Sequence, residues 1–426
     1  MGGSGRFRPR DVKGAERDMG ELIQDLKREL REEILQGMSY ERQMTDEELS
    51  QVIDGKILEQ MEREPMALRD RLRLQKELFD SFRRLDILQE LVDDRDVTEI
   101  MVNGPNDIFY EKAGRIQRFK GHFSSEEKLE DVIQQIVGRH NRVVNQASPI
   151  VDTRLSDGSR VNIVLNPISI GGSAVSIRKF PEHPMSMERL VEIEALSPEV
   201  ARLLQILTQA KYNIFISGGT GSGKTTFLNA LSQYIPDDER IITIEDSAEL
   251  QLLGAKNIVR LETRNANTDG VTPITIRDLI RTALRMRPDR IIVGECRGAE
   301  ALDMLQAMNT GHDGSLSTGH ANSPHDIISR IETMVLQGQD FPLNAIRQQI
   351  ASGIDIIVQL GRLRDKSRRV LEVSEVDGFM DGEIVLHTLY RFEETGVLDS
   401  GRIQGFLKKA GTLCHTDKLM AAGLSV

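Results

Sequence analysis

The chain contains the run Gly218-Gly219-Thr220-Gly221-Ser222-Gly223-Lys224-Thr225-Thr226. Residues 218–225 fit the pattern G-x-x-x-x-G-K-[ST], which marks a phosphate-binding loop when a strand precedes it and a helix follows it. Both neighbours are of the right kind, because YNIFIS (212–217) has the pattern of a strand and TTFLNALSQY (225–234) that of a helix. A flexible Gly/Ser loop, the simpler alternative, would not need these flanks. The run therefore predicts a nucleoside triphosphate site.

The residue types in this run suit phosphate chemistry. Small residues let several backbone N–H groups converge on phosphate oxygens, and the N-terminus of the following helix adds partial positive charge. Lys224 is expected to reach the β- and γ-phosphates, and the Thr225 hydroxyl is expected to bind Mg²⁺. A nucleotide bound together with Mg²⁺ is the ligand that this loop predicts.

Two acidic residues follow apolar strands further along the chain. Glu245 ends IITIE (241–245), and Glu295 ends RIIVGE (290–295). Because the carboxyl ends of parallel strands meet at one edge of a sheet, both side chains are expected near the phosphates, where they can act on the metal and on a water. The second segment resembles a Walker B strand, except that Gly294 replaces the usual Asp. Acids that merely cap strand ends are the alternative.

Other candidate residues remain open on spacing alone. His312 and His320 flank the strand-like GSLSTG, and each is either catalytic or structural. Arg281 and Arg285 share a helix face, so they either contact phosphate across a subunit boundary or form surface ion pairs, and Arg287 follows them. Cys296 is expected to be a buried small apolar residue, not a nucleophile.

From the Ser197-Pro198 helix start onward, strands alternate with helices. The strand patterns are NIFIS, RIITIE, IVRLE, RIIVGE and GSLST, and the tail from 355 to about 391 adds more strands. This alternation predicts an α/β fold with a mostly parallel sheet that helices cover on both faces.

The region before it divides into smaller parts. We expect a disordered leader at 1–20, a charged helical bundle at 21–90, an α+β domain at 91–180, a Pro-containing linker at 181–197 and the nucleotide-binding domain with its tail at 198–426. In the α+β domain, Ser124 and Glu127 suggest a capping box that opens a helix. The bundle prediction rests on apolar residues at helical spacing, namely Leu22, Leu26, Leu30 and Ile34, then Leu68, Leu72, Phe79, Phe82 and Leu85.

Composition excludes several classes of protein. The net charge is −11, there is no tryptophan and only 4% of residues are aromatic, which argues against a DNA translocase even though 361–370 (GRLRDKSRRV) is locally basic. No apolar run approaches the roughly 20 residues of a membrane span, and the N-terminus has no signal-peptide pattern. Cys296 and Cys414 are too few for a four-cysteine zinc module. We therefore expect a cytoplasmic protein that binds no nucleic acid.

Three motifs in order carry a family resemblance: GGTGSGKTT (218–226), ITIEDSAEL (242–250) and RMRPDRIIVGECRGAEALDMLQAMNTGHDGSLSTGHANSP (285–324). The chain resembles the secretion ATPase superfamily of type II and type IV machines, and within it the CpaF-type ATPases of Flp (Tad) pilus assembly. The similarity extends from about Leu91 to about Arg391.

The resemblance implies roles for particular residues. Glu245 would polarise the attacking water, Glu295 would act on Mg²⁺ and water, and His320 would sense the γ-phosphate of ATP. Arg160 and Arg178, with Arg154 a weaker candidate, match arginines that the family's N-terminal domain supplies to the nucleotide. Two positions depart from the usual pattern, since Ser247 stands where many relatives have proline and Gly319 where many have a bulky apolar residue.

The resemblance also implies an architecture and partners. A RecA-like P-loop domain would follow a PAS-like α+β domain and a helical bundle, and six subunits would form a ring. The ring would act on a polytopic inner-membrane platform from its cytoplasmic face. Three alternatives remain: a conjugation-type ATPase of type IV secretion, a RecA-like DNA translocase, and a nucleotide-sensing scaffold, which the presence of Lys224, Thr225, Glu245 and Glu295 disfavours.

Overall fold

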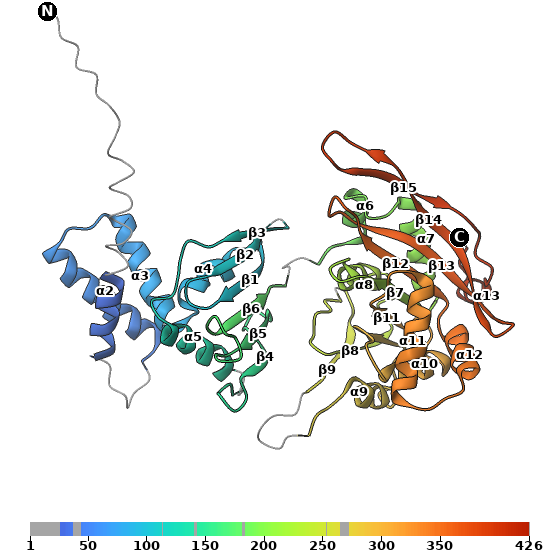
Figure 1. Ribbon diagram of the computed structural model, residues 1–426, viewed down its shortest axis with the longest axis horizontal. Helices are drawn as coiled ribbons and strands as arrows, with labels where there is room; N and C mark the ends of the chain where they lie inside the picture. The colour runs from blue at the N-terminus through green and yellow to red at the C-terminus, as the bar shows by residue number, and fades with distance from the viewer. Residues whose placement is uncertain are drawn as a thin grey trace, which may run out of the picture. The chain divides into compact units, whose positions relative to one another are not determined.

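A computed structural model describes residues 26–36, 44–112, 114–139, 143–180, 184–252, 254–264 and 272–425. The leader expected at 1–20 and the apolar position Leu22 lie outside these ranges. The chain divides into two compact units, Met1–Glu182 and His183–Val426. Figure 1 shows both units.

The first unit begins with helices that share an apolar core. Residues 26–36 are helical, and α2 (Asp46–Arg63) and α3 (Leu68–Arg83) follow, with a Thr45–Glu48 capping box at the start of α2. Short helices η1 (Asp86–Leu88) and α4 (Gln89–Asp93) lead to the sheet. The side chains that the three longer helices bury together are Leu30, Ile34, Leu49, Ile53, Ile57, Leu74 and Leu78.

The apolar stripe predicted for α3 is partly wrong. Leu68 and Leu72 are 68% and 56% exposed, whereas Leu74 and Leu78 are fully buried. At 3.6 residues per turn, the buried pair lies about 120° around the helix from the exposed pair. Spacing correctly predicted a helix but not which face of it packs.

A six-stranded antiparallel sheet completes this unit, in the order β3-β2-β1-β6-β5-β4. Helix α5 (Glu126–Gly138) packs its apolar residues against one face of it. The cap of α5 is Ser125, not the expected Ser124, since the Ser125 hydroxyl accepts from the Lys128 N–H. The strands are β1 (Val97–Asn103), β2 (Ile108–Lys112), β3 (Arg115–Arg118), β4 (Ile150–Arg154), β5 (Arg160–Val164) and β6 (Ala174–Arg178).

The second unit contains a nine-stranded sheet in the order β15-β14-β13-β12-β7-β11-β10-β8-β9. Its strands from β12 to β9 run parallel, and β13 to β15 add an antiparallel extension. The parallel strands are β7 (Ile214–Gly218), β8 (Arg240–Glu245), β9 (Asn257–Glu262), β10 (Arg290–Val293), β11 (Leu316–Gly319) and β12 (Ile356–Arg362). The extension, which reaches past the predicted end near Arg391, consists of β13 (Arg368–Met380), β14 (Glu383–Val397) and β15 (Ile403–Lys409).

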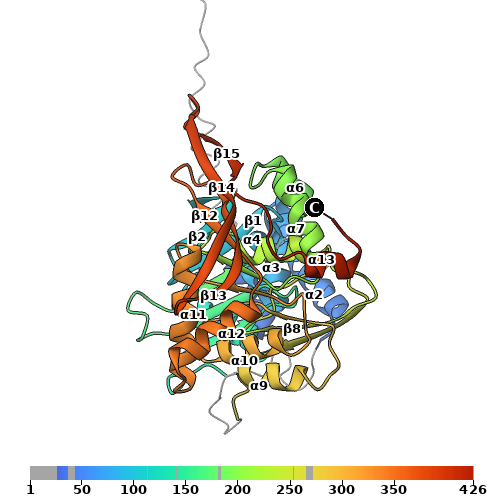
Figure 2. The same ribbon diagram turned by 90° about the vertical axis from the view of Figure 1, so that its right-hand side faces the viewer.

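Helices cover both faces of this sheet, as the alternation predicted. One face packs on α6 (Met187–Glu192), α7 (Pro198–Gln209) and α8 (Lys224–Ser232). The other packs on α9 (Ile276–Ala283), α10 (Glu300–Asn309), α11 (Pro324–Gly338) and α12 (Leu343–Gly353). Figure 2 shows α10 to α12 and α6 to α7 on opposite sides of the strands. A last short helix, α13, spans Asp417–Ala422.

The segment expected as a linker contains one of these helices. In α6, Met187 and Leu190 are buried in the core of the second unit, and α7 then starts at Pro198 behind its cap, Ser197. Nowhere in the described ranges does a helix combine the length and the apolarity needed to cross a bilayer.

Candidate active site

The glycine-rich run forms the turn between β7 and α8. A Cβ on Gly218 would lie 2.5 Å from Ser222 Oγ and 2.7 Å from the Leu360 carbonyl oxygen, so a larger residue does not fit there. Gly221 and Gly223 have φ angles of +71° and +94°, a conformation that side chains disfavour. Gly223 lies directly before α8, where the free N–H groups of the first turn attract anions.

Lys224 is held at the centre of this turn. Its ammonium donates to the carbonyl oxygens of Gly218 and Gly219 at 3.0 and 3.1 Å. The side chain is buried, and this burial lowers the pKa of the ammonium, an effect that Glu295 opposes and Arg297 reinforces. Its charge therefore lies beside the carbonyl oxygens at the start of the loop.

Glu245 ends β8 with its carboxylate buried. Its Oε1 accepts from the backbone N–H groups of Glu249 and Leu250 at 2.8 and 2.9 Å. The side chain also explains why Gly294 stands where a Walker B strand usually has Asp. A Cβ on Gly294 would lie 2.8 Å from Glu245 Cγ, so the neighbouring strand leaves space for the glutamate.

Glu295 follows β10 and has a histidine and an arginine as neighbours. Its carboxylate pairs with Nδ1 of His320, and its Oε2 accepts from Arg297 Nη2 at 2.6 Å. Burial alone would raise the pKa of Glu295, but Arg297, His320 and Lys224 outweigh this effect and lower it. The structure thus brings together Lys224, Glu295 and His320, which are far apart in the sequence.

These residues come from four strands that are neighbours in the sheet. The strands lie in the order β7-β11-β10-β8. At their carboxyl ends they carry, in the same order, the glycine-rich turn, His320, Glu295 and Glu245. Parallel pairing along this row brings the carboxyl ends of all four strands together.

Two arginines at this edge were missed in the sequence. Arg297 bridges the acids, because its second nitrogen lies 3.5 Å from Asp246 Oδ2 while the first binds Glu295. Arg368, the first residue of β13, donates from Nε to the Gly221 carbonyl at 2.8 Å. Arg297 follows Glu295 by two positions and could have been suspected, whereas only the pairing of β12 with β7 brings Arg368 to the loop.

The structure also resolves several open alternatives. Arg281 pairs with Asp303 at 2.9 Å, which favours the surface ion pair. His312 approaches the Ala307 carbonyl at 3.2 Å through Nδ1, away from the glycine-rich turn. Cys296 is buried, and this burial raises the pKa of its thiol well above the usual value, as expected for an apolar role. Gly319 has no room for a larger residue, since a Cβ there would lie 2.9 Å from the Phe215 ring.

The arginines expected from the α+β domain lie in the first unit, in one cross-strand row. Arg154 is opposite Arg160 across β4 and β5, and Arg160 is opposite Arg178 across β5 and β6. Their strands alternate between buried and exposed residues, and the three arginines share the face that α5 does not cover. Strand register therefore groups the three candidates, although it does not rank them.

The sequence profile of type II/IV secretion system proteins matches residues 83–402. The chain belongs to this family. As a member of the type II/IV secretion system family, the protein is an ATPase, and its substrate is a nucleotide.

Curated family members with similar sequences carry transfer and secretion names. The chain is 33% identical over 311 residues to a putative conjugal transfer protein of Mycobacterium tuberculosis, covering 71% of this chain and 88% of that protein. It is 32% identical over 332 residues to the conjugal transfer protein TrbB of Rhizobium radiobacter, covering 77% and 98%. It is 33% identical over 320 residues to the type IV secretion system protein PtlH of Bordetella pertussis, covering 69% and 94%.

Solved structures share the fold at lower identity. The ATPase DotB of Legionella pneumophila is 22% identical, with a TM-score of 0.51, over 69% of this chain and 80% of that one. The pilus retraction motor PilT, solved with bound ADP, is also 22% identical with a TM-score of 0.51, over 77% and 83%. The mixed α/β fold is therefore that of secretion and pilus ATPases.

The residues present fit a nucleotide with Mg²⁺. The Ser222 hydroxyl is buried in the loop without a hydrogen-bond partner among the described residues, so it is available to a phosphate. Among all the residues that the structure describes, no three His, Cys, Asp or Glu side chains are grouped so that they could hold a metal ion. Mg²⁺ bound with a nucleotide needs only one or two protein ligands, because phosphates and waters supply the others. Thr225 and Glu295 suit that requirement.

Proposed function

We propose that the protein is a hexameric ATPase that couples ATP hydrolysis to the assembly of a Flp (Tad)-type type IV pilus. The observation that carries this proposal is the row of four strand ends with Lys224, Glu245, Glu295 and His320. A loop that cradles phosphates beside two buried carboxylates suits phosphoryl transfer to water better than nucleotide sensing alone. The sequence resemblance in 285–324 supports the pilus branch.

In this proposal each residue has one role. The glycine-rich loop and Lys224 bind the β- and γ-phosphates, and Lys224 exchanges its contacts with the loop carbonyls for phosphate oxygens. Thr225 and Glu295 hold Mg²⁺, which neutralises phosphate charge when bound. Glu245 orients a water and takes its proton as the new P–O bond forms and the bond to the leaving ADP oxygen breaks. His320 senses the γ-phosphate through the position of Glu295.

The proposal extends to the whole chain. A helical bundle (21–90) and a PAS-like α+β domain (91–180) precede a linker segment (181–197) and a RecA-like ATPase domain (198–426). Arg160 and Arg178 deliver positive charge to the γ-phosphate when the two units close, so that hydrolysis is coupled to movement. The ring acts from the cytoplasmic face on polytopic proteins of an inner-membrane platform.

A conjugation-type ATPase of type IV secretion is the second candidate. The names of TrbB and PtlH, which match over most of their length, favour it. Both candidates share the same active site, so residues near the nucleotide do not separate them.

Deletion of the gene in its host separates the candidates. We expect loss of surface pili by electron microscopy, with DNA transfer and protein secretion intact, and restoration by the wild-type gene but not by Lys224→Ala. Intact pili with lost transfer or secretion would move the assignment to type IV secretion. No change in any of these would contradict both.

A further inference from the structure

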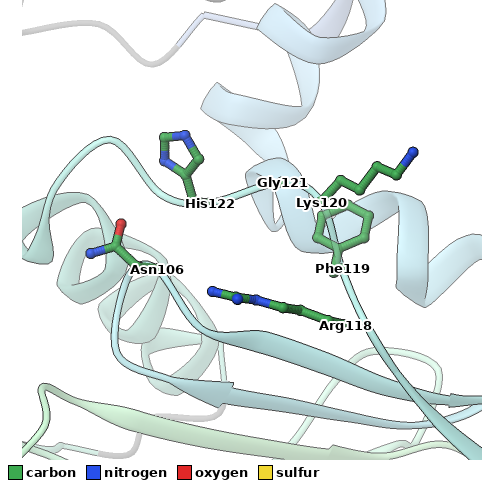
Figure 3. A pocket seen from close by; sticks show the side chains of 6 residues that line it. All are labelled: Asn106, Arg118, Phe119, Lys120, Gly121 and His122. Carbon is green, nitrogen blue, oxygen red and sulfur yellow. The ribbon is translucent and has the colours of Figure 1, made fainter.

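A cavity of about 500 Å³ lies at the end of the β2–β3 hairpin in the first unit. It is lined by Asn106, Arg118, Phe119, Lys120, Gly121 and His122 (Figure 3). They come from the loop between β1 and β2, from the last residue of β3 and from the loop that follows β3. The cavity has no part in the roles assigned above, because β3 is at the opposite edge of the sheet from β4, which carries Arg154.

The side chains that line the cavity carry positive charge and no negative charge. Its polar side chains are a guanidinium, an ammonium, an imidazole and a carboxamide, and none is a carboxylate. The segment 112–122 (KAGRIQRFKGH) contains no acidic residue, although the chain as a whole has a net charge of −11. Asp107 accepts from Arg118 Nη2 at 2.6 Å, and the guanidinium has four further N–H donors.

The loops that form the cavity are held in place. Gly121 lies against the Phe119 ring, where a Cβ would be 2.5 Å from Cε1, so only glycine fits. Phe119 in turn packs edge-to-face on Tyr110, with ring centroids 6.5 Å apart. The Phe123 N–H donates to the Pro105 carbonyl at 2.9 Å and ties one loop to the other. The lining is therefore preorganised, which reduces the entropy lost on binding.

Two side chains of the lining, those of Arg118 and Asn106, approach each other from different segments. Figure 3 shows the Arg118 guanidinium extending toward the loop that carries Asn106, while Lys120 points away. His122 Nδ1 lies 3.1 Å from the Phe123 carbonyl oxygen, so this ring nitrogen is already in contact with the backbone. Lys120 contributes long-range attraction, and direct contacts fall to Arg118 and Asn106.

We propose that this cavity binds the phosphate group of a phosphate ester, either a small soluble ester or the headgroup of an anionic phospholipid. A guanidinium matches the spacing of phosphate oxygens and donates paired hydrogen bonds to them. The carboxamide of Asn106 adds N–H donors from the loop between β1 and β2.

Binding by the full-length protein tests this assignment. With ADP saturating the glycine-rich loop, glycerol 3-phosphate is titrated by calorimetry, and vesicles of phosphatidylglycerol or phosphatidylcholine are sedimented with the protein. Binding to glycerol 3-phosphate assigns a soluble ester, and binding to phosphatidylglycerol vesicles alone assigns a lipid headgroup. Absence of both contradicts the assignment.

Variants show whether the cavity is responsible. Arg118→Gln should weaken binding about tenfold, as loss of a charge-assisted hydrogen bond does. Asn106→Ala, on an exposed loop, gives a second test if Arg118→Gln fails to fold. Arg115→Gln is the matched control, since Arg115 is an exposed arginine on the same strand outside the cavity. Equal losses in Arg118→Gln and Arg115→Gln, or none in the cavity variants, would overturn the proposal.

Discussion

Individual residues at the strand ends carry the chemistry that we propose. Glu245 and Glu295 differ in surroundings: backbone N–H groups bind the first, whereas Arg297 and His320 bind the second. Hydrogen bonds from backbone N–H groups fix the orientation of the Glu245 carboxylate, and the Arg297 guanidinium favours the ionised form of Glu295. This difference supports Glu245 as the base and Glu295 as the group that acts on the metal.

We expect Glu245→Gln to bind ATP but to lower its turnover about 10²- to 10⁴-fold, the usual contribution of a general base. Gln keeps the shape of the side chain and an acceptor for the two N–H groups, so the local structure should persist. Measured phosphate release and nucleotide affinity check this. Glu262→Gln is the control, because Glu262 pairs in register with Glu245 on the edge strand. Rapid turnover by Glu245→Gln would transfer the base role to Glu295.

Arg297→Ala should lower kcat about 10- to 100-fold, the cost typical of losing a group that orients a catalytic ligand. KM for ATP should change less, because Arg297 contacts the carboxylates and not the loop. Arg297→Lys should recover part of kcat, since it restores the charge without the forked geometry. A rise in KM with unchanged kcat would show that Arg297 only binds nucleotide.

At the scale of elements, the β12–β13 hairpin supports the glycine-rich loop. β12 pairs with β7, and Arg368 follows the hairpin turn. The turn is fixed by Asp365, whose carboxylate accepts from the Ser367 N–H and hydroxyl and from the Ile403 N–H at 2.6–2.9 Å. Partial burial would raise the pKa of Asp365, but these hydrogen bonds outweigh it and lower the pKa to about 2.

Asp365→Asn should therefore reduce stability in a pH-dependent way. The folded-state pKa lies below the unfolded value of about 3.9, so the carboxylate stabilises the fold above about pH 4 and loses this effect as the pH falls toward 2. We expect a loss of about 1 kcal/mol, or 2–4 °C in Tm, at pH 7, and a smaller loss at pH 3. Calorimetry at pH 7 and at pH 3 measures the change in Tm, and Asp399→Asn, which changes an exposed residue, is the control. An equal loss at both values would contradict the assigned contacts.

Sequence predicted the elements of the second unit well, because its strands are apolar runs bounded by clear helix caps such as Ser197 and Ser323. The sequence did not predict features that depend on how neighbouring elements pack. The face of α3 depends on neighbouring helices, and the choice of Ser125 over Ser124 depends on one hydrogen bond. Arg368 joined the site through β12–β7 pairing, a contact between segments more than a hundred residues apart.

At the scale of the whole molecule, two units carry complementary groups. The second unit has the glycine-rich loop and the acids, and the first has the row Arg154, Arg160 and Arg178. An anionic nucleotide needs positive charge from outside the loop during phosphoryl transfer. The proposed closure of the units supplies a source for it.

Arg160→Ala should lower ATP turnover of the assembled protein about 1,000-fold, the lower end of the range for an arginine that stabilises the transferred phosphate. Arg154→Ala and Arg178→Ala in the same row rank the three arginines. Arg115→Ala, at the other edge of the sheet, is the control. Unchanged steady-state kinetics in all three row variants would show that the first unit does not act on the nucleotide.

In the proposed function, the loop at 218–226 is the site of ATP hydrolysis. Steady-state phosphate release by the full-length protein with ATP and Mg²⁺, measured beside Lys224→Ala, tests it most directly, with Lys256→Ala as a surface control. We predict turnover by the wild-type and control proteins and loss of at least about 100-fold in Lys224→Ala, because the one cation inside the loop is gone. Full turnover by Lys224→Ala would contradict the account.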